Sequence, residues 1–270
     1  RLALVQDRAA AGHPAGTAVP PGHAIRVLTG AVMPAGTDTV AMQEEVALDE
    51  GSVTIARSIR ASSNRRRAGE DIAAGATLFG PGLMLRPHHV AVAAEIGLAR
   101  LPVFAPLRLA LLSSGDELRE PGDSLPPGAV FDANRYLLRG LLRHLPVEVD
   151  DLGILPDDAE AVAAALLEAA QNHHVILTSG GASKGDEDHV VRTVERHGRL
   201  HFWQIAMKPG RPLAFGQLGK ALTIGLPGNP VAAAVCFMRL ARPVLARLAG
   251  ADWLEPRAFA VPAAFEMTKP

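Results

Sequence analysis

The run SGGASKGDED at positions 179–188 places small residues directly before a cluster of acids, a composition suited to holding a charged ligand. Glycines leave backbone N–H groups uncovered, and a helix that begins after such a loop adds partial positive charge at its N-terminus. We therefore expect Ser179, Gly180, Gly181 and Ser183 to cradle a phosphate group.

Acidic and basic side chains elsewhere in the chain complement this loop. Glu117, Asp157 and Asp188 could hold Mg²⁺, because this ion prefers carboxylate oxygens and keeps several of its waters. Lys208, in the run MKPGRP, could neutralise phosphate charge, with Arg211 close by in the sequence. Together these residues predict a site that binds phosphate and a divalent cation.

A structural interpretation is open for each residue taken alone. Asp157 and Asp186 could cap helices, and Lys208 could be a solvated loop cation. Capping needs only one acid per helix and does not explain the glycines, so the joint pattern favours a binding site.

Other common sites are not indicated. Cys236 is the only cysteine, so no intramolecular disulfide can form, and its apolar neighbours predict a small buried residue. The sequence has no H-E-x-x-H, C-x-x-C, Walker A or G-x-S-x-G motif. A net charge of -1 argues against nucleic-acid or membrane binding driven by net charge. No apolar run approaches the ~20 residues of a membrane span, and no signal peptide is visible, so we expect a cytoplasmic protein.

Alternating strands and helices are predicted for the second half of the chain, and these elements must position the site. The expected strands are 107–114, 147–154, 174–179, 213–218 and 221–226, and the expected helices are 133–145, 157–171, 188–198 and 230–250, the last bent at Pro243. This order predicts an α/β fold with a mostly parallel sheet covered by helices on both faces. Ligands of such sheets bind beyond the carboxyl ends of the strands, where Gly, Ser, Pro and Asp collect here.

The first half has a different texture. Short apolar runs separated by Gly and Pro, among them 24–30, 38–48, 52–59 and 76–85, predict short strands of small β-rich domains, with one helix at 87–99. We expect four parts: a small β-rich domain (1–71), a linker-type β/α segment (72–106), the α/β domain (107–255) and the start of a truncated C-terminal β domain (256–270). The chain begins without methionine and ends after a new strand, which suggests a fragment trimmed at both ends.

Two stretches of the first half could also bind anions. RRRAGED at 65–71 offers arginine forks that suit phosphate or other oxyanions, although a solvated turn with local ion pairs would explain it as well. TGAVMPAGTDTV at 29–40 is a turn whose threonine could reach an anion.

Eight motifs in one order resemble those of the molybdopterin molybdenumtransferase family, to which the C-terminal domain of gephyrin is related. They are RVLTGAVMPAGTDTVAMQEEV, RRRAGEDIAAG, SSGDEL, FDANRY, GILPDD, SGGASKGDEDH, MKPGRPLAFG and GLPGNPVAA. Each motif alone is weak, but the series covers almost the whole chain.

The resemblance implies a reaction and an assembly. Members of this family take adenylylated molybdopterin and molybdate, cleave the adenylate with Mg²⁺, release AMP and insert molybdenum into the dithiolene. They act as homodimers, with the site between the α/β domain of one subunit and the small β domain of the other. By motif, Glu117, Asp157, Asp188 and Lys208 resemble the catalytic residues of the α/β domain, the three acids also being the expected metal ligands.

Further substrate-binding residues are implied by the same resemblance. Pro227 and Pro230 match the family's LPGNP turn, and Thr29, Arg66 and Asp71 resemble the contribution of the partner's β domain.

The chain also departs from the family pattern. Gln204 stands where many members have lysine, a loss for which Lys184 or Arg211 could compensate. The S-x-M-D-G-x-A segment expected near the N-terminus is missing, and most of the C-terminal β domain is absent, so this length of chain could be inactive alone.

Two alternatives remain open. One is the molybdopterin adenylyltransferase of the same pathway, also a candidate partner, which has a similar α/β domain but lacks the β-rich N-terminal half. The other is a non-enzymatic dimeric scaffold of the same fold.

Overall fold

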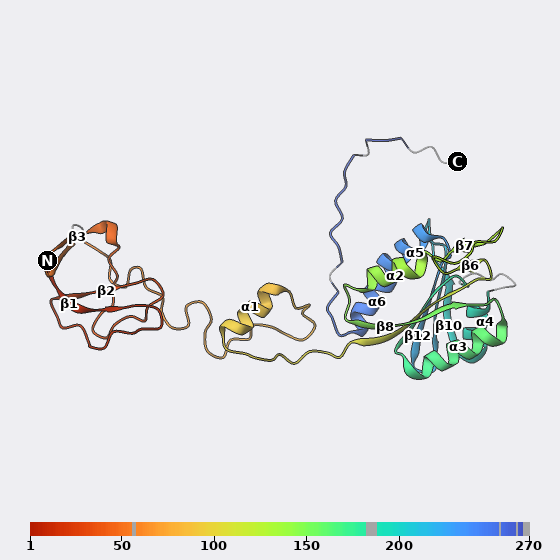
Figure 1. The fold of residues 1–270 in the computed structure, drawn as a ribbon, viewed down its shortest axis with the longest axis horizontal. Coiled ribbons are helices and arrows are strands. Elements are labelled where there is room, and N and C mark those ends of the chain that lie inside the picture. The colour runs from red at the N-terminus through yellow and green to blue at the C-terminus, as the bar shows by residue number, and fades with distance from the viewer. Residues whose placement is uncertain (56–57, 182–187, 254, 263, 267–270) are drawn as a thin grey trace. The chain divides into compact units, whose positions relative to one another are not determined.

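The structure is a computed structural model that describes residues 1–55, 58–181, 188–253, 255–262 and 264–266. It divides into two compact units, Arg1–Leu78 and Phe79–Pro270. The colour in Figure 1 follows the residue number from the first unit to the second. The finer division into four parts stays a prediction.

The first unit is built on a four-stranded sheet in the order β2-β1-β4-β3. Its elements are β1 (Leu2–Ala9), β2 (His23–Val27), the short 3-10 helix η1 (Gln43–Glu45), β3 (Val46–Asp49) and β4 (Ser52–Ile55). β1 pairs with β2 in parallel, while β4 pairs antiparallel with both β1 and β3. The predicted β-rich character of this region is confirmed, although β1 was not among the predicted strands.

The strand predicted at 76–85 is wrong, because this segment is irregular throughout. Gly80, Pro81 and Gly82 interrupt its apolar run, and proline cannot donate a ladder hydrogen bond. The Gly82 carbonyl instead accepts a hydrogen bond from the Asp252 N–H at 2.9 Å. The helix predicted next is present as α1 (Pro87–Glu95), with proline in its first turn.

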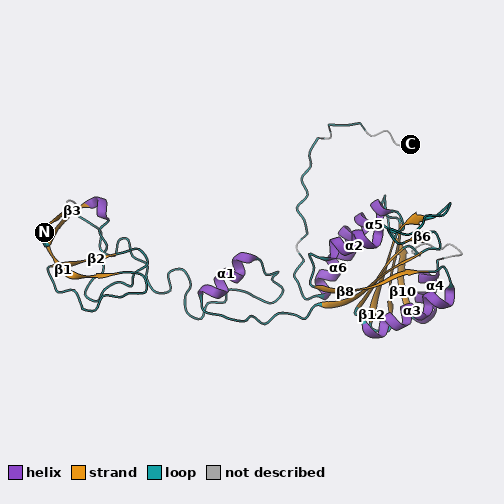
Figure 2. Ribbon diagram, in the orientation of Figure 1, coloured by secondary structure: helices purple, strands orange, loops and turns teal. Residues whose placement is uncertain are grey.

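A six-stranded sheet forms the body of the second unit (Figure 2). Across the sheet the strands are β10 (Arg199–Gln204), β11 (Pro212–Leu218), β12 (Ala221–Leu226), β9 (Val175–Ser179), β5 (Leu107–Ser114) and β8 (Val147–Leu155). The neighbours β12, β9, β5 and β8 run parallel, and β11 runs against them. A separate short ladder joins β6 (Leu118–Arg119) to β7 (Val130–Phe131).

Helices cover both faces of this sheet (Figure 1). One face carries α2 (Asn134–Leu142), α5 (Pro230–Cys236) and α6 (Arg242–Leu248), and the other carries α3 (Ala159–Asn172) and α4 (His189–His197). The predicted fold class, a mostly parallel sheet between two helical layers preceded by a small β-rich unit, is confirmed. No described helix has both the length and the apolar character of a membrane span.

Residue alternation on β5 explains why both faces are covered. Leu109 and Leu111 pack into the cluster beneath α2, α5 and α6, whereas Ala110 and Leu112 pack into the cluster beneath α3 and α4. All four are fully buried. Burying a leucine side chain stabilises a fold by about 1.5–3 kcal/mol. The side chains of β5 therefore stabilise both helical layers against the sheet, and this packing fixes the position of the carboxyl end of the strand.

The long C-terminal helix changes character before Pro243. A π-helical segment, Phe237–Ala241, separates α5 from α6. Proline lacks an N–H and its ring crowds the carbonyl one turn earlier, and a wider turn accommodates both defects. The irregularity predicted at Pro243 therefore lies in the turn that precedes it.

Candidate functional site

The carboxyl ends of β12, β9, β5 and β8 are neighbours in the sheet, so the segments that follow them meet at one edge. Hydrogen bonds join these segments directly. The Gly180 N–H donates to the Leu226 carbonyl at 3.1 Å, and the Gly115 N–H donates to the Leu155 carbonyl at 3.3 Å.

Asp157 connects the segments that follow β8 and β5 by hydrogen bonds, and we call this set of contacts the Asp157 brace. Its carboxylate accepts hydrogen bonds from the Ser114 hydroxyl at 3.0 Å and from the Asp116 N–H at 3.2 Å. In return the Asp157 N–H donates to the Asp116 carboxylate at 3.0 Å. The His189 ring nitrogen Nε2 lies 3.2 Å from the Asp157 carbonyl, which adds the start of α4 to this brace.

The helix cap of α3 is the next residue, Asp158. Its side chain accepts a hydrogen bond from the Ala161 N–H at 2.8 Å. The interpretation of Asp157 as a helix cap is therefore wrong, and the Asp157 carboxylate belongs to the edge where the strands end. Asp186, the other cap considered, lies outside the described residues.

The glycine turn after β9 needs glycine at both described positions. Gly180 and Gly181 have φ of 88° and 65°, a region that favours glycine. A Cβ on Gly180 would lie 2.6 Å from the Ser114 carbonyl oxygen, and one on Gly181 would lie 2.7 Å from the Val190 side chain. The Gly180 N–H is already bonded within the fold, so Gly180 contributes the shape of the turn. Ser183 lies outside the described residues.

Glu117 follows β5, and Asp188 precedes α4. The Glu117 carboxylate folds back over Gly115, where an added Cβ would approach it to 2.5 Å. Asp188 stands at the N-cap position of α4, whose described first turn donates no hydrogen bond to its side chain. Neither carboxylate is used as a helix cap.

These carboxylates do not form a ready-made metal centre. Among the described residues, no group of three or more His, Cys, Asp or Glu side chains could hold a metal ion. Mg²⁺ commonly takes one or two protein carboxylates and completes its shell with waters and substrate phosphates. Each Asp157 oxygen accepts one hydrogen bond and keeps a further lone pair, so the donor chemistry fits an ion that binds together with its substrate.

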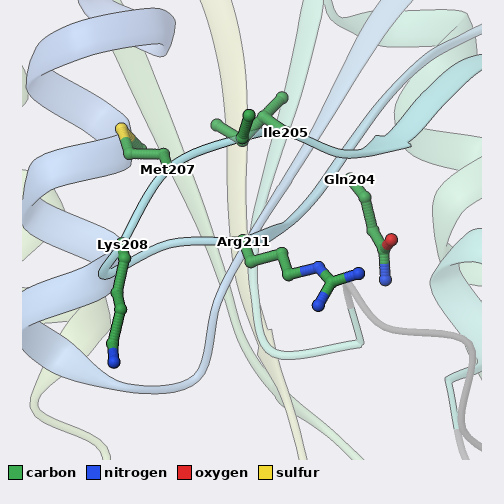
Figure 3. A pocket seen from close by; sticks show the side chains of 6 residues that line it. Gln204, Ile205, Met207, Lys208 and Arg211 are labelled. Atoms are coloured by element: carbon green, nitrogen blue, oxygen red, sulfur yellow. The ribbon is translucent and has the colours of Figure 1, made fainter.

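A cationic hollow of about 550 Å³ lies at the β10–β11 connection. It is lined by Gln204, Ile205, Ala206, Met207, Lys208 and Arg211. In Figure 3 the polar ends of Lys208, Arg211 and Gln204 lie to one side of the connection, and Ile205 and Met207 to the other. No described carboxylate lies within 4.0 Å of the Lys208 or Arg211 side-chain nitrogens, so their charges are available to an anion.

Cys236 contacts the β10–β11 connection at Gly210. A Cβ on Gly210, which has φ of 110°, would lie 2.5 Å from the Cys236 sulfur. The Cys236 Sγ–H donates to the Gly210 carbonyl at 3.5 Å, and burial raises the pKa of the thiol. Its predicted role as a small buried residue is confirmed.

The turn after β12 completes the edge. Asn229 caps α5 by accepting a hydrogen bond from the Ala232 N–H at 3.0 Å, and Pro230 occupies the first turn of that helix. Pro227 precedes them directly after the strand. Both prolines therefore shape this turn, whatever else they contact.

Three predicted residues belong to the first unit. Arg66 and Asp71 form an exposed ion pair at 2.8 Å, and the Arg67 N–H donates to the Glu70 carboxylate at 2.9 Å. Thr29 is exposed in a turn. The arginine run thus contains the local ion pair of the alternative interpretation, and its anion-binding role stays a prediction.

Several residues of the site were missed from the sequence. Ser114, Asp116 and His189 contact Asp157, and Asn134 contacts two strand-end turns. All four lie in motifs that the sequence already singled out, SSGDEL, FDANRY and SGGASKGDEDH, which were the signal for their importance. Their partners depend on strand register, which the sequence does not display.

Comparison with protein families matches most of the chain. Residues 110–247 match a probable molybdopterin binding domain, and residues 2–97 match the MoeA N-terminal region (domain I and II). The first match spans the sheet and its strand-end segments, and the second spans the β-rich unit and α1.

Similar proteins point the same way. A molybdopterin molybdenumtransferase of Haemophilus influenzae is 39% identical over 98% of this chain and 66% of its own length. A gephyrin of Dictyostelium discoideum is 29% identical over 84% of this chain and 36% of its own length. The crystal structure of a molybdopterin biosynthesis MoeA protein from Pyrococcus horikoshii is 28% identical, with a TM-score of 0.76 over 93% of this chain and 61% of its own.

The chain thus spans 66% or less of the length of these relatives. Within that span, the two family matches cover the segments of the chain in which the eight motifs lie. On these grounds the chain belongs to the molybdopterin molybdenumtransferase family, with an α/β domain that matches the probable molybdopterin binding domain, preceded by a part that matches the MoeA N-terminal region.

Proposed function

We propose that the protein acts in molybdenum cofactor biosynthesis and inserts molybdenum from molybdate into adenylylated molybdopterin, with release of AMP. The observation that carries this proposal is the meeting of the Asp157 brace and the glycine turn at one edge of the sheet. The cationic hollow, on the β10–β11 connection of the same sheet, supplies the charges that an anionic ligand needs.

Charge stabilisation is the main demand of this reaction. Cleaving a phosphoanhydride-type bond develops negative charge on the departing phosphate oxygens, and positioned cations stabilise it. Lys208 and Arg211 are proposed to bind the oxyanion of molybdate or phosphate, because neither has a described acidic partner. Arg211 would also offset Gln204, which stands where many family members have lysine.

The carboxylates are proposed to act through Mg²⁺, which would neutralise phosphate charge when bound. Its proposed ligands are Asp157, Asp188 and Glu117, of which one or two would hold it at a time beside waters and the substrate phosphate. Ser114 and Asp116 orient the Asp157 carboxylate by their hydrogen bonds. No side chain is assigned as nucleophile, so the attacking oxygen belongs to water or molybdate.

The remaining substrate contacts and the assembly are part of the same proposal. Ser179, Gly180, Gly181 and Ser183 would surround a phosphate, with Pro227 and Pro230 shaping the neighbouring turn. Thr29, Arg66 and Asp71 would come from the partner subunit of a homodimer. Such a protein would work in the cytoplasm, beside the adenylyltransferase that makes its substrate.

The proposal is tested with neighbouring aspartates in the intact protein. Asp157→Ala should lower the rate of Mg²⁺-dependent molybdenum insertion by about 100-fold or more, because a charge-stabilising group is lost. Asp158→Ala, the control, removes a helix cap and should cost about 1 kcal/mol of stability with insertion near the wild-type rate.

The outcome against the proposal is equally concrete. If Asp157→Ala inserts molybdenum at the wild-type rate, the strand-end edge is not the reaction site. If the wild-type protein instead makes adenylylated molybdopterin from ATP and molybdopterin, it is an adenylyltransferase.

A further inference from the structure

The first turn of α2 holds a side chain that the proposed reaction does not use. We infer that Asn134 is a positioning residue, which fastens the glycine turn after β9 to the turn after β12 and so sets the floor of the ligand site. The substrate experiment below rests on the proposed function, whereas the geometric claim has its own test.

Two hydrogen bonds carry the inference. The Asn134 side-chain nitrogen Nδ2 donates to the Ser179 hydroxyl at 2.8 Å and to the Gly228 carbonyl at 2.7 Å. A carbonyl can only accept, so the nitrogen rather than the oxygen of the amide must face Gly228. Both N–H donors of one side chain are therefore spent on two segments that lie 94 and 45 residues away.

The other end of the amide shows that this arrangement has a cost. Asn134 is 7% exposed, and its buried Oδ1 has no hydrogen-bond partner among the residues that the structure describes. Leaving a buried polar atom unpaired typically costs about 1–3 kcal/mol. Asn134 does not recover this as a helix cap, because Ala133 occupies the N-cap position. The residue is accounted for by the two turns it joins.

The turns that Asn134 joins are the ones next to the ligand site. Ser179 leads directly into Gly180, whose N–H bonds the end of β12. Gly228 lies between Pro227 and Asn229, the cap of α5. The backbone hydrogen bond between Gly180 and Leu226 is a described contact of these turns that does not depend on the Asn134 side chain. The side chain is buried, so it acts on a ligand through the turns and not by contact.

Hydrogen exchange of the intact protein tests the geometric claim without any ligand. In Asn134→Ala the Gly180 amide should exchange about 10-fold faster or more, because its turn opens more often. Amides of β5 should exchange as in the wild type, which shows that the sheet is folded. Unchanged exchange at Gly180 would overturn the inference.

A second variant keeps the question decidable if Asn134→Ala folds poorly. The carboxyl introduced by Asn134→Asp can donate to the Gly228 carbonyl only when protonated, and burial raises the pKa of such a carboxyl. Ser179 and Gly228 carry no titratable group, and the nearest charges along the chain are those of Asp132 and Arg135, which are paired with each other.

The affinity of Asn134→Asp for adenylylated molybdopterin, relative to wild type, should thus fall about 10-fold at pH 8 and recover as the pH is lowered. Asn172→Asp, the same change at an exposed site, should track the wild type at every pH. A pH-independent ratio near one for Asn134→Asp would overturn the inference. Failure of the wild type to bind this ligand would count against the proposed function instead, and Gly180 exchange would still decide the role of Asn134.

Discussion

At the scale of single residues, the site depends on backbone positions that tolerate only glycine. Gly180 combines a positive φ with the Ser114 carbonyl oxygen close to where a Cβ would lie, so two separate constraints act on it. Gly219, in the β11–β12 turn, has a positive φ of 55° but open space around it. The pair therefore separates conformational strain from steric contact.

Alanine substitutions at these two glycines should differ in cost. Gly219→Ala should destabilise the fold by about 1–2 kcal/mol, the cost of a left-handed conformation. Gly180→Ala should cost about 1–3 kcal/mol more, because the added Cβ meets the Ser114 carbonyl at 2.6 Å and the turn must shift. Urea unfolding of both variants measures the difference, and equal costs would mean that the contact at Gly180 is not tight.

At the scale of elements, the first turn of α2 makes hydrogen bonds and ion pairs to several other segments of the second unit. Arg135, next to Asn134, is 3% exposed and pairs with the Asp132 carboxylate at 3.1 Å and with the Asp151 carboxylate at 2.8 Å. It also bonds the Glu120 carboxylate, on the arm that leads from Glu117 to β7. Burial alone would lower the pKa of Arg135, but these partners raise it.

Removing this arginine should be costly. Arg135→Met leaves Asp132, itself 2% exposed, as a buried charge without its partner, so the stability should fall by about 3–5 kcal/mol. Arg139→Met removes an exposed arginine that also pairs with Asp151, and should cost less than about 1 kcal/mol. Chemical denaturation compares the two, and a similar small loss in both would contradict this role.

The ion pair between Arg135 and Glu120 predicts that the stability of the fold depends on pH. The hydrogen bond from Arg135 lowers the pKa of Glu120 below its ordinary value of 4.5. The stabilisation is therefore present above pH 4.5 and is lost as the pH falls through the lowered pKa of the folded state. In Arg135→Met this part of the pH dependence should be absent.

Elements were predictable where burial dictated the residue pattern. The buried strands β5, β9 and β12 are nearly continuous apolar runs, and α3 and α4 show helical spacing. β10 was missed because it is an edge strand whose residues, RLHFWQ, are mostly exposed and mix polar with apolar side chains. The apolar run at 76–85 failed as a strand because Gly80, Pro81 and Gly82 interrupt it.

The site was predictable in its residue types but not in its pairings. A register shift in the β5–β8 ladder, between Leu111 and Leu112, sets Ser114 beside Leu155 and so brings Asp157 within reach. Such a shift depends on the extra residue near Gly153, which has φ of 78°. The sequence indicates that Asp157 follows a strand, but only the register reveals its partners.

At the scale of the whole molecule, the proposed site needs residues from two units. Asp188 lies in the second unit, and Arg66 lies in the first. In the proposed homodimer each reaction site would combine the second unit of one subunit with the first unit of its partner. This arrangement can be tested with dimers that combine two different variant subunits.

Subunits carrying Asp188→Ala and subunits carrying Arg66→Ala should each be inactive alone in the intact protein. After unfolding and refolding in equal amounts, half of the dimers are mixed, and each mixed dimer has one intact site, so about a quarter of the wild-type activity should return. If each site were built within one subunit, the mixture would stay inactive.

The most direct test of the account is calorimetric titration of the intact protein with adenylylated molybdopterin in the presence of Mg²⁺. Lys208→Ala should weaken binding by about 10-fold or more, equivalent to about 1.4 kcal/mol, because it removes a cation of the hollow. Lys220→Ala removes an exposed lysine from the turn at the opposite, amino end of β12 and should bind as the wild type does. Equal affinity of the wild type and Lys208→Ala would contradict the claim that the strand-end edge receives the anionic substrate.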